Sequence, residues 1–170
     1  ETHWAINAEA LVALGRYPHG TTADADAQAI NVAMTATATT AFCGRPVTQL
    51  SGGERARVLM ARVLAGEPQW ILADEPLANL DPGYQIDTLE LLRTQANQGI
   101  GVIAVLHDLH HAARYADHII LLHQGRVFEQ GTPSQVLTKA TLASVYVIDA
   151  NVTTGEDGAL HLSINGRVAP

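Results

Sequence analysis

The residues best suited to chemistry lie in two short groups, and the first is a serine, two glycines and a glutamate at residues 51–54. Ser51 and Glu54 have the spacing of a capping box, which predicts a helix that begins directly after Ser51. Gly52 and Gly53 have no Cβ, so an anion can approach the backbone N–H groups, and the helix dipole favours a phosphate there. The group therefore predicts an anion-binding helix start.

The second group is Asp74 and Glu75, which directly follow the apolar run at residues 70–73. The run predicts a short strand buried on both faces, and open α/β sheets keep their chemistry at the carboxyl ends of such strands. Asp74 is placed to hold a hard cation such as Mg²⁺, directly or through water, and Glu75 could polarise an attacking water. Two solvated acids would explain this group alone, but not both groups in this order and at this distance.

Alternating helices and strands must position these groups. Caps, glycines and apolar periodicity predict helices at 4–14, 24–35, 51–66, 83–98, 108–115, 132–137 and 142–147. Strands are predicted at 70–73, 101–106, 118–123 and 126–129, with a terminal hairpin of 152–154 and 160–164 around a turn at 156–158. The unit from 70 to 106 is expected to be a parallel strand–helix–strand, so that His107 emerges beside the two acids. The Thr/Ala tract at 35–40 is expected to fray.

The motifs resemble those of the ATP-binding subunit of ABC transporters. LSGGE at 50–54 is similar to the signature motif, 70–75 to Walker B with its following glutamate, and 78–81 to the D-loop. The phrase GRYPH at 15–19 is similar to one in the ATPases of iron–siderophore, haem and cobalamin importers. The resemblance covers essentially all of the chain, and LSGGE is close to diagnostic by itself.

The resemblance implies an α/β fold, namely the carboxyl-terminal part of a P-loop NTPase (ABC ATPase) domain with a mostly parallel sheet, helices and an α-helical subdomain. Residues 1–66 would form the helical subdomain that ends in the signature helix. Residues 67–130 would form half of the RecA-like core, with Walker B, D-loop and switch histidine. Residues 131–170 would add carboxyl-terminal helices and a hairpin.

The resemblance also implies a mechanism in which two copies meet head to tail and trap ATP with Mg²⁺. The helix start at 51–54 would bind the γ-phosphate of the nucleotide held by the other copy, with Ser51 and the Gly53 amide in contact. Asp74 would hold Mg²⁺ through water, Glu75 would act as general base, and His107 would orient the water. Asp81 would cross the dimer seam and report occupancy to the other site.

The whole protein would then be the ATPase subunit of an importer, peripheral on the cytoplasmic face of the bacterial inner membrane and bound to transmembrane permease subunits. Its cargo would be an iron chelate, haem or cobalamin, between which the sequence does not choose. A phosphate loop of the form G-x-x-x-x-G-K-[ST] does not occur in the chain, whose one lysine is Lys139. We therefore expect an amino-terminally truncated fragment that does not hydrolyse ATP alone.

The same expectation leaves the strand faces at Ile71 and at 102–106 partly uncovered, which predicts a marginally soluble fragment. With 170 residues the chain has the size of one domain, and its net charge of −7 argues against a protein that binds the nucleic-acid backbone. The lone Cys43 excludes an internal disulfide, and no apolar run approaches the roughly 20 residues of a membrane span.

Three alternatives remain open at this stage. The chain could come from an ABC ATPase that acts on nucleic acid, although its acidic charge speaks against this. It could be a degenerate, non-enzymatic fragment that only docks on a membrane partner. The histidines and aspartate at 107–111 could instead ligate zinc or iron, but His110 and His111 would point about 100° apart on a helix.

Overall fold

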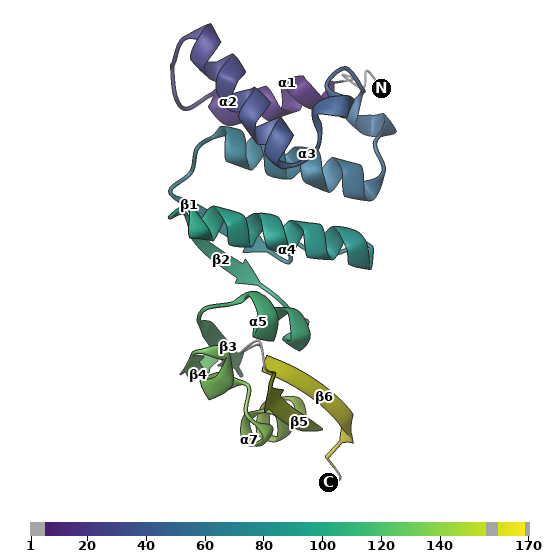
Figure 1. The fold of residues 1–170 in the computed structure, drawn as a ribbon, viewed down its shortest axis with the longest axis vertical. Coiled ribbons are helices and arrows are strands. Elements are labelled where there is room, and N and C mark those ends of the chain that lie inside the picture. The colour runs from purple at the N-terminus through teal and green to yellow at the C-terminus, as the bar shows by residue number, and fades with distance from the viewer. Residues whose placement is uncertain (1–5, 156–159, 169–170) are drawn as a thin grey trace. The chain divides into compact units, whose positions relative to one another are not determined.

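The computed structural model describes residues 6–155 and 160–168, which divide into two compact units, Glu1–Val105 and Leu106–Pro170. The first unit holds helices α1 (Ala8–Ala13), α2 (Ala23–Ala36), α3 (Gly52–Ala65) and α4 (Pro82–Asn97), and strands β1 (Trp70–Asp74) and β2 (Gly101–Val105) (Figure 1). Short 3₁₀ helices follow α1 and precede α3: η1 (Leu14–Arg16), η2 (Thr40–Phe42) and η3 (Val47–Gln49).

The second unit consists of short elements. These are α5 (Leu109–Tyr115), β3 (Ile119–His123), β4 (Arg126–Gly131), α6 (Pro133–Val136), α7 (Lys139–Thr141), the π-helical turn η4 (Leu142–Tyr146), β5 (Ile148–Thr154) and β6 (Leu160–Arg167). β3 pairs with β4 and β5 with β6, both antiparallel, so the predicted hairpins are confirmed. Gln124 and Gly125 both have positive φ and make the tight turn between β3 and β4. The turn predicted at 156–158 lies outside the described residues.

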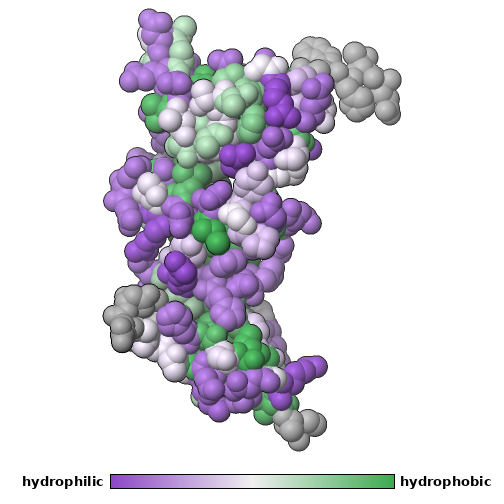
Figure 2. Space-filling view, turned by 45° about the vertical axis from the view of Figure 1, so that its right-hand side comes forward, coloured by the Kyte–Doolittle hydropathy of each residue, from purple (hydrophilic) through white to green (hydrophobic). Residues whose placement is uncertain are grey.

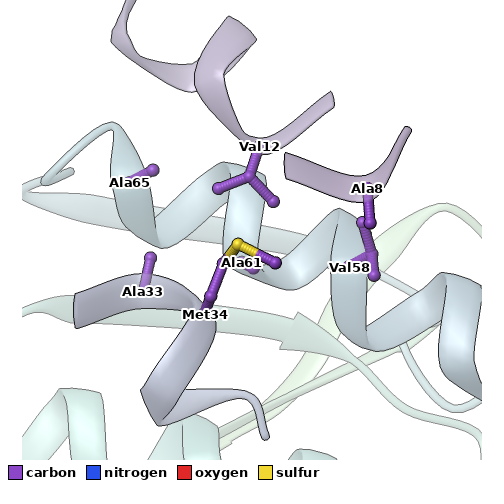
Figure 3. Close-up of a cluster of buried hydrophobic side chains, with 7 residues drawn as sticks. All are labelled: Ala8, Val12, Ala33, Met34, Val58, Ala61 and Ala65. Atoms are coloured by element: carbon purple, nitrogen blue, oxygen red, sulfur yellow. The ribbon is translucent and has the colours of Figure 1, made fainter. Parts of the chain in front are cut away.

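A small core holds α1, α2 and α3 together. It consists mainly of alanines, with Val12, Met34 and Val58 as the larger side chains. Figure 3 shows Val12 from α1 and Met34 from α2 converging on Ala61 of α3. Because alanine leaves helix backbones free to approach closely, three helices pack here around one long side chain.

The predicted parallel unit is confirmed, because β1 and β2 run parallel in continuous register from Trp70 opposite Gly101 to Asp74 opposite Val105. The prediction that β1 is buried on both faces is wrong. Ile71 is 3% exposed, whereas Trp70 is 64% and Leu72 is 76% exposed, so side chains alternate between a covered and an open face. Ile71 is therefore covered, contrary to the expectation for that residue.

The open face also includes Ile103 and Val105 of β2, each about half exposed, as predicted for part of 102–106. Figure 2 shows apolar residues, in green, at the surface among polar ones. Parallel sheets normally have both faces covered. Within the part of the chain that the structure describes, only one face of the β1–β2 pair is covered.

Two further expectations differ from the structure. The helix predicted at 4–14 begins at Ala8, where Asn7 caps it by accepting a hydrogen bond from the N–H of Ala10 at 2.8 Å; residue 4 lies outside the described part. The predicted fraying at 35–40 is wrong. Thr37 and Thr39 are buried, and their hydroxyls donate to the Ala33 and Met34 carbonyls, so threonine side chains complete the end of α2.

Candidate functional site

The start of α3 is a complete capping box, as the sequence predicts. The N–H of Glu54 donates to Ser51 Oγ at 3.2 Å, and the N–H of Ser51 donates to Glu54 Oε2 at 2.8 Å. Ser51 and Gly52 are exposed. The first N–H groups of a helix have no partner within the helix, so the amides that follow Ser51 are oriented toward any anion placed at this end.

Arg45 fixes the glutamate of the capping box, a role that sequence reasoning missed. Its Nη1 donates to Glu54 Oε1 at 3.1 Å, and its Nη2 donates to the Gln49 carbonyl at 3.1 Å. The hydrogen bond from the Ser51 backbone, followed by the one from Arg45, holds the pKa of the Glu54 carboxyl below its usual value. Glu54 is therefore an anion engaged in the cap, and it neutralises part of the positive end of the helix.

The two glycines of the signature have different surroundings. A Cβ built on Gly52 would meet no heavy atom within 4 Å, whereas one built on Gly53 would lie 2.6 Å from Cδ2 of Tyr84. Gly52 therefore fits the predicted open approach of an anion. Gly53 also leaves room for the Tyr84 ring of α4 against α3, which nothing in the local motif indicates.

The two acids stand where β1 ends, as predicted. Asp74 is the last residue of β1, Glu75 follows it, and both side chains are exposed. Glu75 has a φ of 47°, in the left-handed region that few residues other than glycine adopt, and its carbonyl accepts from the N–H of Ala78 at 3.1 Å. The chain therefore turns sharply at Glu75, directly after the strand.

The turn from Pro76 to Asp81 is held by α4. Gln85 Nε2 donates to the carbonyls of Leu77 at 3.4 Å and Leu80 at 3.2 Å, and Asn79 has a φ of 60°. Asp81 caps α4, since its Oδ1 accepts from the N–H of Tyr84 at 3.1 Å. The D-loop aspartate thus has a structural role here, in addition to the one predicted for it.

His107 is exposed and belongs to the second unit. Its neighbour Asp108 caps α5 by accepting from the N–H groups of His110 at 2.7 Å and His111 at 3.0 Å. Partial burial acts to raise the pKa of Asp108, but the backbone hydrogen bonds from His111 and His110 outweigh it and hold the pKa below its usual value. The role of His107 beside Glu75 stays a prediction.

The metal alternative at 107–111 finds no support in the described residues, among which no three His, Cys, Asp or Glu side chains form a group that could hold an ion. His110 is exposed, as predicted, but His111 is half-buried and its Nδ1 has no hydrogen-bond partner. The expectation that both histidines are solvated is therefore wrong for His111. His111 instead packs edge-on against Tyr115, with ring centroids 6.5 Å apart.

The acids at the end of β1 fit a magnesium ion. Mg²⁺ binds proteins through one or two carboxylates and takes its remaining ligands from phosphates and water. Asp74 offers one exposed carboxylate of this kind at a strand end.

No helix among the described residues is long and apolar enough to cross a membrane.

Comparison with known proteins agrees with this arrangement of motifs. Residues 4–78 match the ABC transporter family. Residues 4–78 therefore carry part of an ABC transporter domain, and the predicted resemblance is confirmed. Among curated proteins it is similar to the "Hemin import ATP-binding protein HmuV" of Rhodococcus jostii, with 48% identity over 84% of this chain and 50% of that protein. It is 44% identical to the "Cobalamin import ATP-binding protein BtuD" of Halobacterium salinarum, over 88% of this chain and 38% of that protein.

Solved structures support the fold. An inward-facing ABC transporter described as of the metal-chelate type has a TM-score of 0.82 and covers 96% of this chain and 69% of that chain, although at 24% identity it shows the fold alone. A dimeric bacterial ABC transporter cassette has a TM-score of 0.66 and 28% identity, over 75% of this chain and 57% of that chain. The α/β fold class of the ABC ATPase domain is thus confirmed. The chain spans about half the length of the haem-import relative.

Proposed function

We propose that the chain is part of the ATP-hydrolysing subunit of an importer for an iron chelate, haem or cobalamin. The observation that carries the proposal is the exposed capping box at Ser51 in the same unit as the exposed acids Asp74 and Glu75. Relatives named for haem and cobalamin import support the transport role. In this proposal residues 1–66 are the helical subdomain, 67–130 half of the nucleotide-binding core, and 131–170 its carboxyl-terminal extension.

Each site residue has a defined task in this mechanism. Ser51 and the amides of Gly52 and Gly53 bind the γ-phosphate carried by a second, head-to-tail copy, because the helix dipole and unpaired N–H groups favour an anion. Glu75 accepts the proton of the attacking water at its carboxylate, and His107 orients that water. A magnesium ion held through Asp74 would supply charge neutralisation on the phosphates.

The partners follow from the same proposal. Two ATPase copies form the nucleotide sandwich, which the existence of a dimeric cassette among the similar structures supports. Transmembrane permease subunits bind the copies at the cytoplasmic face of the inner membrane. A nucleic-acid partner is disfavoured by the net charge of −7.

The test is a chimera in which the chain replaces the matching segment of the Rhodococcus jostii haem-import relative, so that the relative supplies the rest of the domain. The chimera is expected to hydrolyse ATP. Glu75→Gln should keep ATP affinity within about 2-fold and lower turnover roughly 10²–10⁴-fold, because the general base is lost. Glu90→Gln is the matched control, since Glu90 is an exposed glutamate on α4.

Three outcomes discriminate between the candidates. Turnover near the parent value in Glu75→Gln removes Glu75 from the mechanism. Tight ATP binding without turnover in the unmutated chimera favours the non-enzymatic docking role. Salt-dependent binding of duplex DNA by the chimera would favour the nucleic-acid-linked class instead.

A further inference from the structure

Tyr84 lies between the signature helix and the D-loop and contacts both. Its backbone N–H donates to Asp81 Oδ1 at 3.1 Å, in the first turn of α4. Its ring lies so close to α3 that a Cβ on Gly53 would be 2.6 Å from Cδ2 and 2.8 Å from Cε2. The start of α3 and the start of α4 therefore meet at one aromatic ring.

Arg57 extends this contact along α3. Gly53 and Arg57 are four residues apart on the helix and so lie on one face. The Arg57 guanidinium carbon is 5.1 Å from the centroid of the Tyr84 ring and 5.4 Å from that of Phe42, and its Nη1 donates to the Ala38 carbonyl at 3.3 Å. A cation held within about 6 Å of two ring centroids is attracted by both π faces.

The contacts continue from Phe42 back to the capping box. The Arg45 guanidinium carbon lies 5.2 Å from the centroid of the Phe42 ring, and Arg45 Nη1 binds Glu54 at 3.1 Å. The first turn of α3 is thus held from two directions, by Tyr84 on α4 and by Arg45 in the segment that precedes α3.

We propose that Tyr84 is a positioning residue that keeps the signature helix start and the Asp81 turn in one rigid arrangement. The proposal rests on the proposed function, in which both motifs act on the nucleotide site shared with a second copy. If the ring is lost, the two motifs can move independently, and a displacement of about 1 Å at a reacting centre can lower a rate about 10²-fold. The ring makes the contacts with Gly53 and Arg57, and the backbone N–H makes the one with Asp81, so phenylalanine should take the place of tyrosine without loss.

The contact itself is tested in the 170-residue chain by two neighbouring glycines. Gly53→Ala places a methyl group against Tyr84 and should lower the melting midpoint by roughly 3–8 °C. Gly52→Ala is the matched control, because its methyl group meets open space and the midpoint should stay within about 2 °C. In a Tyr84→Ala background, Gly53→Ala should lower the melting midpoint by only about 1 °C or less. An equal loss in both backgrounds overturns the contact.

A second measurement keeps the contact testable if a variant does not fold. In the unmutated chain, an NOE between the Gly53 Hα protons and the Tyr84 Hδ protons is expected, and its absence refutes the contact.

The positioning role is tested in the chimera described above. Tyr84→Ala should lower kcat about 10-fold or more, while KM for ATP changes less than about 3-fold, and Tyr84→Phe should retain at least half of the parent kcat. Loss of turnover in Tyr84→Phe as well, or an unchanged kcat in Tyr84→Ala, overturns the role. An unmutated chimera with no ATP turnover counts instead against the proposed function, while the melting and NOE measurements still decide the contact.

Discussion

Replacing Ser51 by aspartate should separate the stability of α3 from its function. Ser51 Oγ accepts from the N–H of Glu54 at 3.2 Å, and an aspartate carboxylate can accept the same hydrogen bond. Its charge gains about 0.3–1 kcal/mol from the helix dipole and loses about 0.2–0.5 kcal/mol to repulsion by Glu54 three residues later. Ser51→Asp should therefore change the free energy of unfolding by less than about 0.8 kcal/mol, whereas Ser51→Ala should cost about 1 kcal/mol.

Turnover should instead fall more in Ser51→Asp than in Ser51→Ala. Two unit charges about 4 Å apart repel by about 1 kcal/mol in water and about 4 kcal/mol at an effective dielectric constant of about 20. Because Ser51 is exposed, the lower half of this range, about 1–2.5 kcal/mol, applies to a carboxylate facing the γ-phosphate, which gives a loss of roughly 5–70-fold. Ser51→Ala removes a single hydrogen bond to the phosphate, worth about 1 kcal/mol or roughly 5-fold.

The assays are denaturant unfolding of the chain, followed by circular dichroism, and phosphate release by the chimera. Thr22→Asp is the matched control, because Thr22 caps α2 in the same way, accepting from the N–H of Ala25 at 3.4 Å, and lies outside the proposed site. It should leave turnover unchanged. The reasoning is refuted if Ser51→Asp keeps full turnover, or if turnover falls more in Ser51→Ala than in Ser51→Asp.

Three other substitutions probe the packing and charge of the first unit. Met34→Ala should lower the free energy of unfolding by about 3 kcal/mol in denaturant unfolding, because Met34 is buried among alanines. Val32→Ala on the exposed side of α2 is the control and should lower it by less than about 0.5 kcal/mol. Equal losses in the two variants would contradict the burial of Met34 in this core. Hydrogen bonds from Thr21 and then Arg16 hold the pKa of Asp26 below its usual value, so its stabilisation is present above the unfolded pKa of about 3.9 and lost as pH falls through the lower folded pKa. Unfolding followed against pH should show a shallower acid dependence in Asp26→Asn, and an identical slope would count against these hydrogen bonds to Asp26. Leu72→Ser on the open face of β1 should reduce the fluorescence of bound 1-anilinonaphthalene-8-sulfonate, and unchanged fluorescence would show that dye binds elsewhere.

The parts of the structure that the sequence predicts well depend on residues close together along the chain. The Ser51–Glu54 capping box spans three positions, and so does the one between Thr132 and Gln135. The glycine-containing turn after β3 is equally local. In each case the side chain satisfies a backbone group within a few residues, so residue type and spacing are sufficient evidence.

The parts that could not be predicted depend on residues far apart along the chain. Nothing around Gly53 indicates that Tyr84 packs on it, and nothing around Glu54 indicates that Arg45 binds it. The alanine–threonine tract at 35–40 is expected from the sequence to fray, but Thr39 is buried and its hydroxyl donates to the Met34 carbonyl, which fixes the end of α2. Propensity describes the isolated segment, whereas tertiary packing decides these cases.

Glu75 combines a predictable residue with an unpredictable backbone. The sequence places a carboxylate directly after β1, but its φ of 47° costs a residue other than glycine about 1–2 kcal/mol. Asn79 has a similar φ at the other end of the same turn, and asparagine is one of the residues that tolerate it. A glycine at position 75 would remove the strain and also the carboxylate. A left-handed φ also occurs at Gln124, in an ordinary hairpin turn, so the proposed role of Glu75 as the base rests on its exposed carboxylate at the end of the strand rather than on this strain.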